Sequence, residues 1–179
     1  MQVFWRQGYE GTSLSDLTEA MGINRPSLYA AFGNKEELFL KVLDRYGSGP
    51  VAYVMCALDE PTARQVVEKL LRESAALMGD PEHPRGCMAV QGILCGGQGT
   101  GYVLEHARSR RVAMQRKIQE RFERAQAEGD LSAAVGAADL ARHVVMIING
   151  LSIQASNGAS AEELKAAAEF ALRSVPGLD

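Results

Sequence analysis

Apolar residues recur along most of this chain with the period of an α-helix, and no sustained strand-type alternation interrupts them. The clearest stripe consists of apolar or small residues spaced three or four apart, at Ala63, Val66, Val67, Leu70, Leu71, Ser74, Leu77 and Met78. The pattern therefore predicts an all-α protein. Its longer helices are expected over residues 62–78, 86–95, 102–128, 137–157 and 160–175.

Shorter helices are predicted near the N-terminus from their capping residues. Ser13 is followed three residues later by Asp16, which is a capping-box spacing, and the helix over 13–22 ends at Gly22. A second helix is predicted over 24–32, because Asn24 can cap it and the next-but-one residue is a proline, which is tolerated in a first helical turn.

A third short helix, over 34–46, is predicted from the spacing of Asn34 and Glu37. The sequence Gly-Ser-Gly-Pro over 47–50 then breaks the helical pattern. We expect two domains, one over 1–46 and one over 51–179.

The first two short helices have the pattern of a helix-turn-helix, with Gly22 and Ile23 in the turn. If Leu28 faces the core, the residues around it near the start of the second helix are left outside: Arg25, Pro26, Ser27, Tyr29 and Ala30. A helix presented in this way fits the major groove of B-DNA, and its free N–H groups favour phosphate.

Sixteen residues in order then carry a resemblance to a known family: Phe4, Gly8, Tyr9, Thr12, Ser13, Asp16, Leu17, Ala20, Gly22, Ser27, Leu28, Tyr29, Phe32, Lys35, Glu36 and Leu38. In these positions the chain resembles the DNA-binding domain of the TetR/AcrR family of one-component bacterial transcriptional regulators. The resemblance covers about the first quarter of the chain, and the remainder agrees with the family only as a pattern of helices.

The resemblance implies contacts to duplex DNA from Thr12, Ser13, Asn24, Arg25, Pro26, Ser27, Tyr29, Ala30 and Lys35. Thr12, Ser13, Tyr29 and Lys35 would contact phosphates, which fixes register without reading sequence. Arg25 is the side chain able to pair with guanine through two hydrogen bonds, whereas Pro26 and Ala30 offer only apolar contact.

Two features depart from the family pattern. Ala31 stands where many members have histidine or an aromatic residue, and Met1 falls inside the family's first helix. Residues 1–46 carry five basic side chains against six acidic ones, for a sum of −1. We therefore expect a longer natural chain, or else weak DNA affinity through reduced counterion release.

For the second domain, the resemblance implies an effector pocket and a dimer. The dimer would form a four-helix bundle from the last two helices of each copy, with Val144, Ile147, Ile148, Leu151, Leu164, Ala168, Ala171 and Leu172 at the interface. The pocket would be lined by Met78, Met88, Val90, Leu94, Tyr102, Met114, Ile118 and Met146. Together these imply a homodimeric repressor that a small molecule releases from a palindromic operator.

Composition excludes several other functions. The net charge of −3 on 179 residues does not suit a nucleic-acid coat protein. Three cysteines without metal-ligand spacing predict a reduced, cytoplasmic setting, and no motif implies a metal or another cofactor. The uncharged stretch over 86–103 holds too many glycines for a membrane span.

Two alternatives stay open at the level of the sequence: a helical ligand-binding protein that has lost DNA binding, and a small enzyme that uses the C-terminal cavity.

Overall fold

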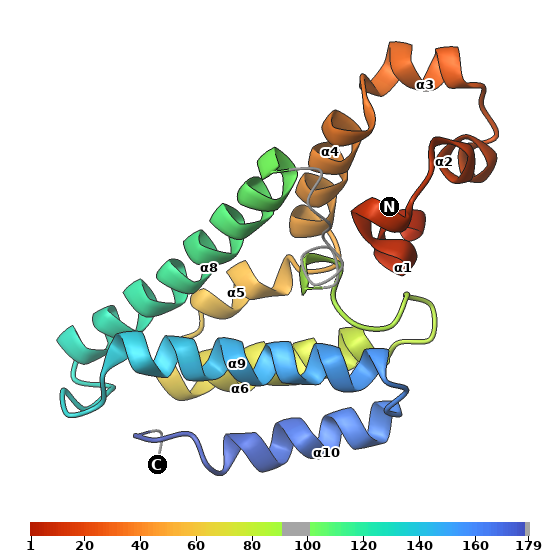
Figure 1. The fold of residues 1–179 in the computed structure, drawn as a ribbon. Helices are drawn as coiled ribbons and strands as arrows, with labels where there is room; N and C mark the ends of the chain where they lie inside the picture. The colour runs from red at the N-terminus through yellow and green to blue at the C-terminus, as the bar shows by residue number, and fades with distance from the viewer. Residues whose placement is uncertain (91–100, 178–179) are drawn as a thin grey trace. The chain divides into compact units, whose positions relative to one another are not determined.

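The computed structural model describes residues 1–90 and 101–177, and over these residues it contains helices and turns without a β-strand (Figure 1). In chain order the helices are α1 (Gln2–Gly11), α2 (Leu14–Met21), α3 (Arg25–Phe32), α4 (Lys35–Ser48), α5 (Tyr53–Leu58), α6 (Ala63–Gly79), α8 (Gly101–Ala127), α9 (Ala137–Ser156) and α10 (Ala161–Leu172). The all-α prediction is confirmed for this part of the chain.

The chain packs as two units. The first contains Met1–Val51 together with Cys87–Arg110, and the second contains Ala52–Gly86 together with Arg111–Asp179. Helix α8 contributes its first ten residues to the first unit and the remainder to the second. The predicted boundary near residues 47–50 lies close to the first of these divisions, but the first unit also includes a segment from the middle of the chain.

The caps predicted at Ser13, Asn24 and Asn34 are present, and the structure adds two at Thr62 and Ser160. Ser13, Asn34, Thr62 and Ser160 each accept a hydrogen bond from the backbone N–H three residues later, and each completes a reciprocal capping box. Asn24 caps α3 in the same way without the return bond. The expected helices over 13–22, 24–32, 62–78, 137–157 and 160–175 are present with ends shifted by at most three residues.

An aromatic cluster forms the core of the first unit. Phe4 and Trp5 of α1 are almost fully buried, and the ring of Trp5 meets Tyr46 of α4 edge-on with centroids 4.8 Å apart. Phe39, also of α4, contacts Phe4 edge-on at 5.0 Å and Tyr9 at 5.1 Å. Helix α1 thereby anchors α4 through large apolar surfaces, which are the main source of stability in a small helical unit.

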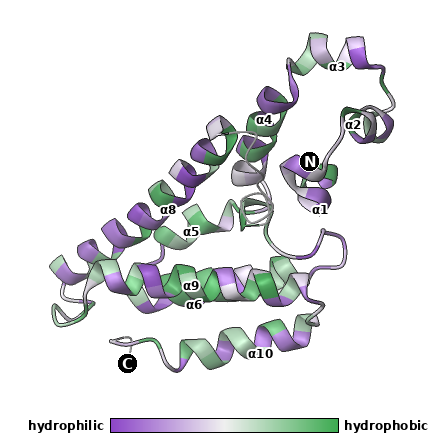
Figure 2. Ribbon diagram, viewed as in Figure 1, coloured by the Kyte–Doolittle hydropathy of each residue, from purple (hydrophilic) through white to green (hydrophobic). Residues whose placement is uncertain are grey.

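In the second unit, helix α6 packs against α5, α9 and α10 (Figure 1). The apolar stripe expected over 62–78 is its buried face, and all of its members except Leu77 are buried. Gly79 at the end of α6 approaches α10 so closely that a Cβ atom there would lie 2.9 Å from the Cα of Ala161. Figure 2 shows α9 as hydrophobic over much of its length and α8 as mainly hydrophilic.

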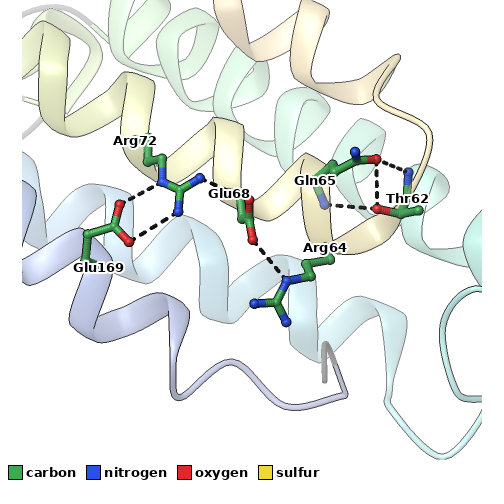
Figure 3. Close-up of polar contacts among 6 residues, drawn as sticks. All are labelled: Thr62, Arg64, Gln65, Glu68, Arg72 and Glu169. Atoms are coloured by element: carbon green, nitrogen blue, oxygen red, sulfur yellow. Dashed lines mark hydrogen bonds and ion pairs between the residues drawn. The ribbon is translucent and has the colours of Figure 1, made fainter.

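A polar network ties α10 to α6 on the surface of this unit (Figure 3). Arg72 donates from Nε to one oxygen of Glu169 at 2.7 Å and from Nη2 to the other at 3.2 Å. Its third nitrogen reaches Glu68 at 3.0 Å, and Glu68 also accepts from Arg64. The paired geometry between Arg72 and Glu169 joins the exposed surfaces of α10 and α6.

A buried arginine organises the turn between α5 and α6. Arg121 of α8 is 4% exposed, and it donates to the carbonyl oxygens of Leu58, Glu60 and Pro61 at 2.8 to 3.1 Å. Burial is the main cause that lowers the pKa of Arg121. The guanidinium thus satisfies carbonyls that the end of α5 leaves without helical partners.

Two elements were not individually predicted from periodicity, and one prediction cannot be followed throughout. Helix α5 has six residues, too few for a helical stripe, and α1 was expected only through the family resemblance. Of the helix expected over 86–95, Met88–Val90 are helical, and residues 91–95 lie outside the described residues.

Candidate nucleic-acid interface

Helices α2 and α3 form the expected helix-turn-helix. Gly22 takes the left-handed conformation with φ of 64° and ψ of 30°, and its N–H bonds back to the carbonyls of Thr18 and Glu19. A side chain at this position would be strained, because L residues rarely adopt positive φ. Leu17 of α2 and Leu28 of α3 are buried against the unit's core, which sets which face of α3 points outward.

The outward face of α3 carries the residues expected to read bases. Arg25, Pro26, Ser27 and Ala30 are exposed, and Tyr29 is 48% exposed although it is aromatic. Arg25 donates from Nη2 to the hydroxyl of Ser15 on α2 at 2.9 Å. An exposed helical face of this composition can enter a major groove and offer one bidentate donor, one phenol and two apolar contacts.

The start of α3 offers fewer free backbone amides than the sequence suggested. The side chain of Asn24 accepts from the N–H of Ser27, its carbonyl accepts from the N–H of Leu28, and Pro26 has no N–H. The N–H groups of Asn24 and Arg25 are the ones left at this helix start. The free N–H groups expected at the start of α3 are therefore limited to these two, and most of the polar groups that α3 exposes belong to its side chains.

Thr12 was expected to touch phosphate, but the structure directs it inward. It is 1% exposed, and its hydroxyl donates to the carbonyl of Gly8 at 2.6 Å, where α1 bends. The hydroxyl thereby satisfies a carbonyl that the bend releases, so its side chain is unavailable to DNA in this conformation. Ser13, one residue later, is exposed and holds the cap of α2.

The capping box of α2 also shapes the local charge. Asp16 accepts from the backbone N–H of Ser13 at 2.8 Å, and this bond is the first cause that holds the pKa of Asp16 below its usual value. Because the carboxylate is hydrogen-bonded at the start of α2, its negative charge interacts favourably with the positive end of the α2 dipole. The hydroxyl of Ser13 accepts a hydrogen bond from the backbone N–H of Asp16, and hydrogen bonding between this hydroxyl and the carboxylate is the second cause that lowers the pKa of Asp16.

Lys35 lies at the first position of α4, with its ammonium 4.4 Å from the centre of the Tyr9 ring. Partial burial is the main cause that lowers the pKa of Lys35, opposed by Glu10 and Asp16. Burial likewise raises the pKa of Tyr9 to about 12, so the ring stays neutral beneath the cation. A cation at a helix N-terminus opposes the helix dipole, and the Tyr9 ring, Glu10 and Asp16 offset this cost at Lys35.

The comparisons with known proteins agree with this geometry. The family model described as "Bacterial regulatory proteins, tetR family" matches residues 1–42. The HTH-type transcriptional repressor ComR of Escherichia coli (strain K12) is 34% identical over 99% of this chain and 86% of that protein. The chain belongs to the TetR family. It is a DNA-binding transcriptional regulator, as expected from the sequence.

Solved TetR-family structures extend the similarity along the whole chain. A cysteine mutant of the regulator CifR, complexed with 26bp double-strand operator DNA, has a TM-score of 0.92 at 43% identity and covers 98% of this chain and 92% of that one. A putative TetR regulator from Rhodococcus sp. RHA1 is 44% identical with a TM-score of 0.69, covering 98% of this chain and 95% of that one. These structures also share the helical second domain.

The residues expected to form the TetR-type effector pocket fall into both units. Met78, Met114 and Ile118 belong to the second unit, where Met78 and Ile118 are buried. Met88 and Val90 belong to the first unit and are buried there, and Leu94 lies outside the described residues. Two of the expected lining residues point to solvent instead: Tyr102 is 64% exposed and Met146 is 62% exposed.

Half of the residues expected at the dimer interface are already buried within one subunit. Val144, Leu151, Leu164 and Ala168 are each at most 4% exposed, since they pack into the second unit's own core. Little of their surface is therefore left for another copy. The other four, Ile147, Ile148, Ala171 and Leu172, are half-buried.

Three apolar side chains of α9 and α10 are exposed in this unit, and none of them was among the residues predicted at the dimer interface. Met146 is 62% exposed, Ile153 is 44% exposed and Phe170 is 69% exposed. Met146 and Ile153 are seven residues apart and therefore share one face of α9. Met146 and Ile153 lie two and nine residues after the buried Val144, which places them on the opposite side of an α-helix. This spacing is present in the sequence and could have predicted that they are exposed.

Two findings concern membranes and metals. Within the described residues, no helix combines the length and apolar character needed to cross a bilayer. The same part of the chain holds no group of three or more His, Cys, Asp or Glu residues placed to bind a metal ion.

Proposed function

We propose that this regulator acts as a homodimeric repressor that sets two copies of α3 into the major groove of a palindromic operator. The observation that carries the proposal is the exposed outer face of α3, where Arg25, Ser27 and Tyr29 stand free of the core that holds Leu28. The relatives named as transcriptional repressors, and the operator complex of a structural relative, support the same direction.

The proposed contacts divide by chemistry. Arg25 pairs with guanine, while Pro26 and Ala30 contact apolar base edges such as the thymine methyl. Ser13, Tyr29 and Lys35 bind phosphates and fix the position of α3 along the duplex. Thr12 supports the bend in α1 and makes no side-chain contact with DNA.

A second copy of the chain is the proposed partner for the exposed faces of α9 and α10. On α9, Met146, Gly150 and Ile153 follow each other at spacings of four and three, and nothing lies within 4 Å of where a Gly150 side chain would begin. A glycine between two exposed apolar residues allows a facing helix to approach closely. Phe170 of α10 supplies the largest exposed apolar ring for the same interface.

Release by a small molecule completes the proposal. A ligand that binds one spacing of the two α3 helices better than another shifts the dimer toward that spacing, and hence toward or away from DNA. We place this ligand among the helices of the second unit that carry Met78, Met114 and Ile118, whose side chains suit an adaptable apolar site.

Selection from a random duplex pool tests the DNA-binding part. The wild-type chain is expected to enrich an inverted repeat whose half-sites lie about one helical turn apart. The same repeat is expected to be protected in a footprint of the DNA upstream of the gene. A pool that shows no enriched repeat, with protein shown to be folded, would refute the proposed function.

The effector is tested by adding small molecules to the complex with the enriched duplex. A true effector is expected to lower operator affinity and raise the melting temperature of the free protein together, because it binds the folded state. Substituting Met114 by Gln is expected to weaken both effects, and Met55, an exposed methionine of the same unit, provides the matched control. Equal ligand response in both variants would remove Met114 from the site.

A further inference from the structure

A single side-chain hydrogen bond links the outer surfaces of the two helices of the motif. Arg25, the first residue of α3, donates from Nη2 to the hydroxyl oxygen of Ser15 at 2.9 Å. Ser15 lies in the first turn of α2, and both side chains are exposed. The bond therefore contributes little to the core, and its position is at the proposed protein–DNA surface.

We propose that Ser15 is a positioning residue that sets base specificity by holding the guanidinium of Arg25. This inference rests on the proposed function, in which Arg25 pairs with guanine. An arginine side chain has many rotamers when it is free in solvent, and freezing it on DNA costs conformational entropy. A hydrogen bond formed before binding confines Arg25 in advance, so less entropy is lost at the correct base.

The bond leaves Arg25 able to read guanine. The guanidinium has five N–H donors in one plane, and Ser15 occupies one of them. Four donors are left, and two neighbouring ones are enough for the O6 and N7 atoms of guanine. Because the guanidinium is planar, a hydrogen bond at one of its nitrogens also restricts the orientation of its other N–H donors.

The neutral chemistry of Ser15 matters as much as its place. A hydroxyl confines the guanidinium without neutralising it, so the full positive charge stays available to DNA. The neighbouring carboxylate of Asp16 is occupied by the backbone of Ser13 at 2.8 Å. Among the described residues no ion pair joins Arg25 to Glu19, which follows Ser15 by one turn of α2.

Ser15 also connects base reading to the DNA backbone. Its oxygen accepts from Arg25, and its own O–H is a donor that a phosphate oxygen can accept. The first helix of this motif crosses the backbone when the second lies in the groove. A phosphate bound there would fix Ser15, and through it the orientation of Arg25.

The test is binding selection on a random duplex pool with five forms of the full chain: wild type, Ser15→Ala, Ser15→Thr, Arg25→Ala and the double variant Ser15→Ala with Arg25→Ala. Arg25→Ala identifies the guanine that Arg25 reads as the position whose preference disappears. Ser15→Ala is expected to weaken the preference at that one position by about threefold to tenfold, the size of one lost hydrogen bond. Ser15→Thr keeps the hydroxyl and is expected to retain the preference.

The matched control is Ser109→Ala, which removes an exposed serine hydroxyl from α8. It is expected to leave the whole selected motif unchanged. In the Arg25→Ala background, Ser15→Ala is expected to have no further effect at the guanine, because a positioning residue acts only through the residue it holds. Melting temperatures of all variants establish that the fold is intact.

Three outcomes would overturn the proposal. An unchanged guanine preference in Ser15→Ala would show that Arg25 needs no support, and an increased preference would show that Ser15 restrains Arg25 away from DNA. Equal weakening of the guanine preference in Ser15→Thr and Ser15→Ala would show that the hydroxyl is not what holds Arg25. Failure of the wild type to enrich any motif is distinguishable from these results, since it refutes the proposed function and this inference with it.

Discussion

Replacement of Phe170 by alanine is the most direct test of the proposed dimer. The ring is 69% exposed on α10 and contacts little of its own subunit besides Arg173, whose guanidinium lies 5.4 Å from the ring centre. If a second copy covers the ring, Phe170→Ala removes apolar contact from the interface. If nothing covers it, the substitution removes almost nothing.

The size of the effect follows from the exposed fraction. Complete burial of a phenylalanine side chain stabilises by about 1.5–3 kcal/mol, so covering the exposed part of Phe170 contributes about 1–2 kcal/mol per copy. A two-fold interface counts each substitution twice, for about 2–4 kcal/mol. The dimer dissociation constant is then expected to rise by about 30-fold to 1,000-fold.

Leu164→Ala on the same helix is the matched contrast. Leu164 is 1% exposed and packs inside its own subunit. Its truncation is expected to lower the free energy of unfolding by about 2–5 kcal/mol, through lost contacts and the cavity left behind. Phe170→Ala is expected to cost the isolated subunit no more than about 1 kcal/mol, the scale of its exposed contact with Arg173.

Sedimentation velocity over a series of protein concentrations measures dimer dissociation, and urea unfolding at matched concentrations measures stability. Both are needed, because the apparent stability of a dimer depends on concentration. A Phe170→Ala protein that dissociates at the same concentration as wild type would refute the assignment of this face. So would a chain that is monomeric before any substitution.

Three further predictions concern the first unit and the surface network. Lys35→Gln is expected to reduce the slope of log affinity against log salt by about 0.9, the contribution of one phosphate contact, whereas Lys117→Gln on α8 leaves the slope unchanged; equal slopes in all three proteins would place Lys35 away from DNA. Trp5→Ala is expected to destabilise by about 3–5 kcal/mol in urea unfolding, because its fully buried ring supports α4, and a loss below about 1 kcal/mol would contradict the described core. Hydrogen bonding from Arg72 lowers the pKa of Glu169 in the folded protein. The ionised carboxylate therefore adds to the free energy of unfolding in full above the pKa that Glu169 has in the unfolded chain, and this contribution disappears as pH falls through its pKa in the folded protein. The stability difference between wild type and Glu169→Gln is therefore expected to be constant between pH of about 7 and about 5 and to shrink below about 4, and a difference that grows in acid would refute the pairing.

Local signals made the N-terminal helices predictable from the sequence. Asn34 and Glu37 specify a capping box within four residues, and the structure forms both of its bonds. Gly22 could be assigned to the turn because few other residues tolerate its φ of 64°. Signals of this kind need no knowledge of what the helix later packs against.

The exposed apolar residues of α9 could not be predicted with the same success, because periodicity shows which residues are apolar but not what each of them packs against. Val144 and Met146 belong to one apolar run of α9, yet one is buried in the subunit and the other is 62% exposed. Which side of α9 faces α6 and α10 is decided by packing between elements far apart in sequence. The sequence indicated surplus apolar surface but could not show which of these residues the subunit's own core would bury.

The candidate DNA interface shows a related limit, because the same residue types cap helices, brace bends and bind phosphate. Thr12 and Ser13 are adjacent hydroxyl residues, but the bend at Gly8 takes the first hydroxyl inward while the second stays at the surface. The side-chain oxygen of Asn24 accepts a hydrogen bond from the N–H of Ser27 at the cap of α3, so the amide nitrogen is the side-chain group left for a contact with DNA. The contact between Ser15 and Arg25 joins residues ten apart and depends on how α2 and α3 cross, so it could not be predicted from a local sequence pattern. Where one side chain can perform several of these roles, the local bends and crossings of the helices decide which role it takes.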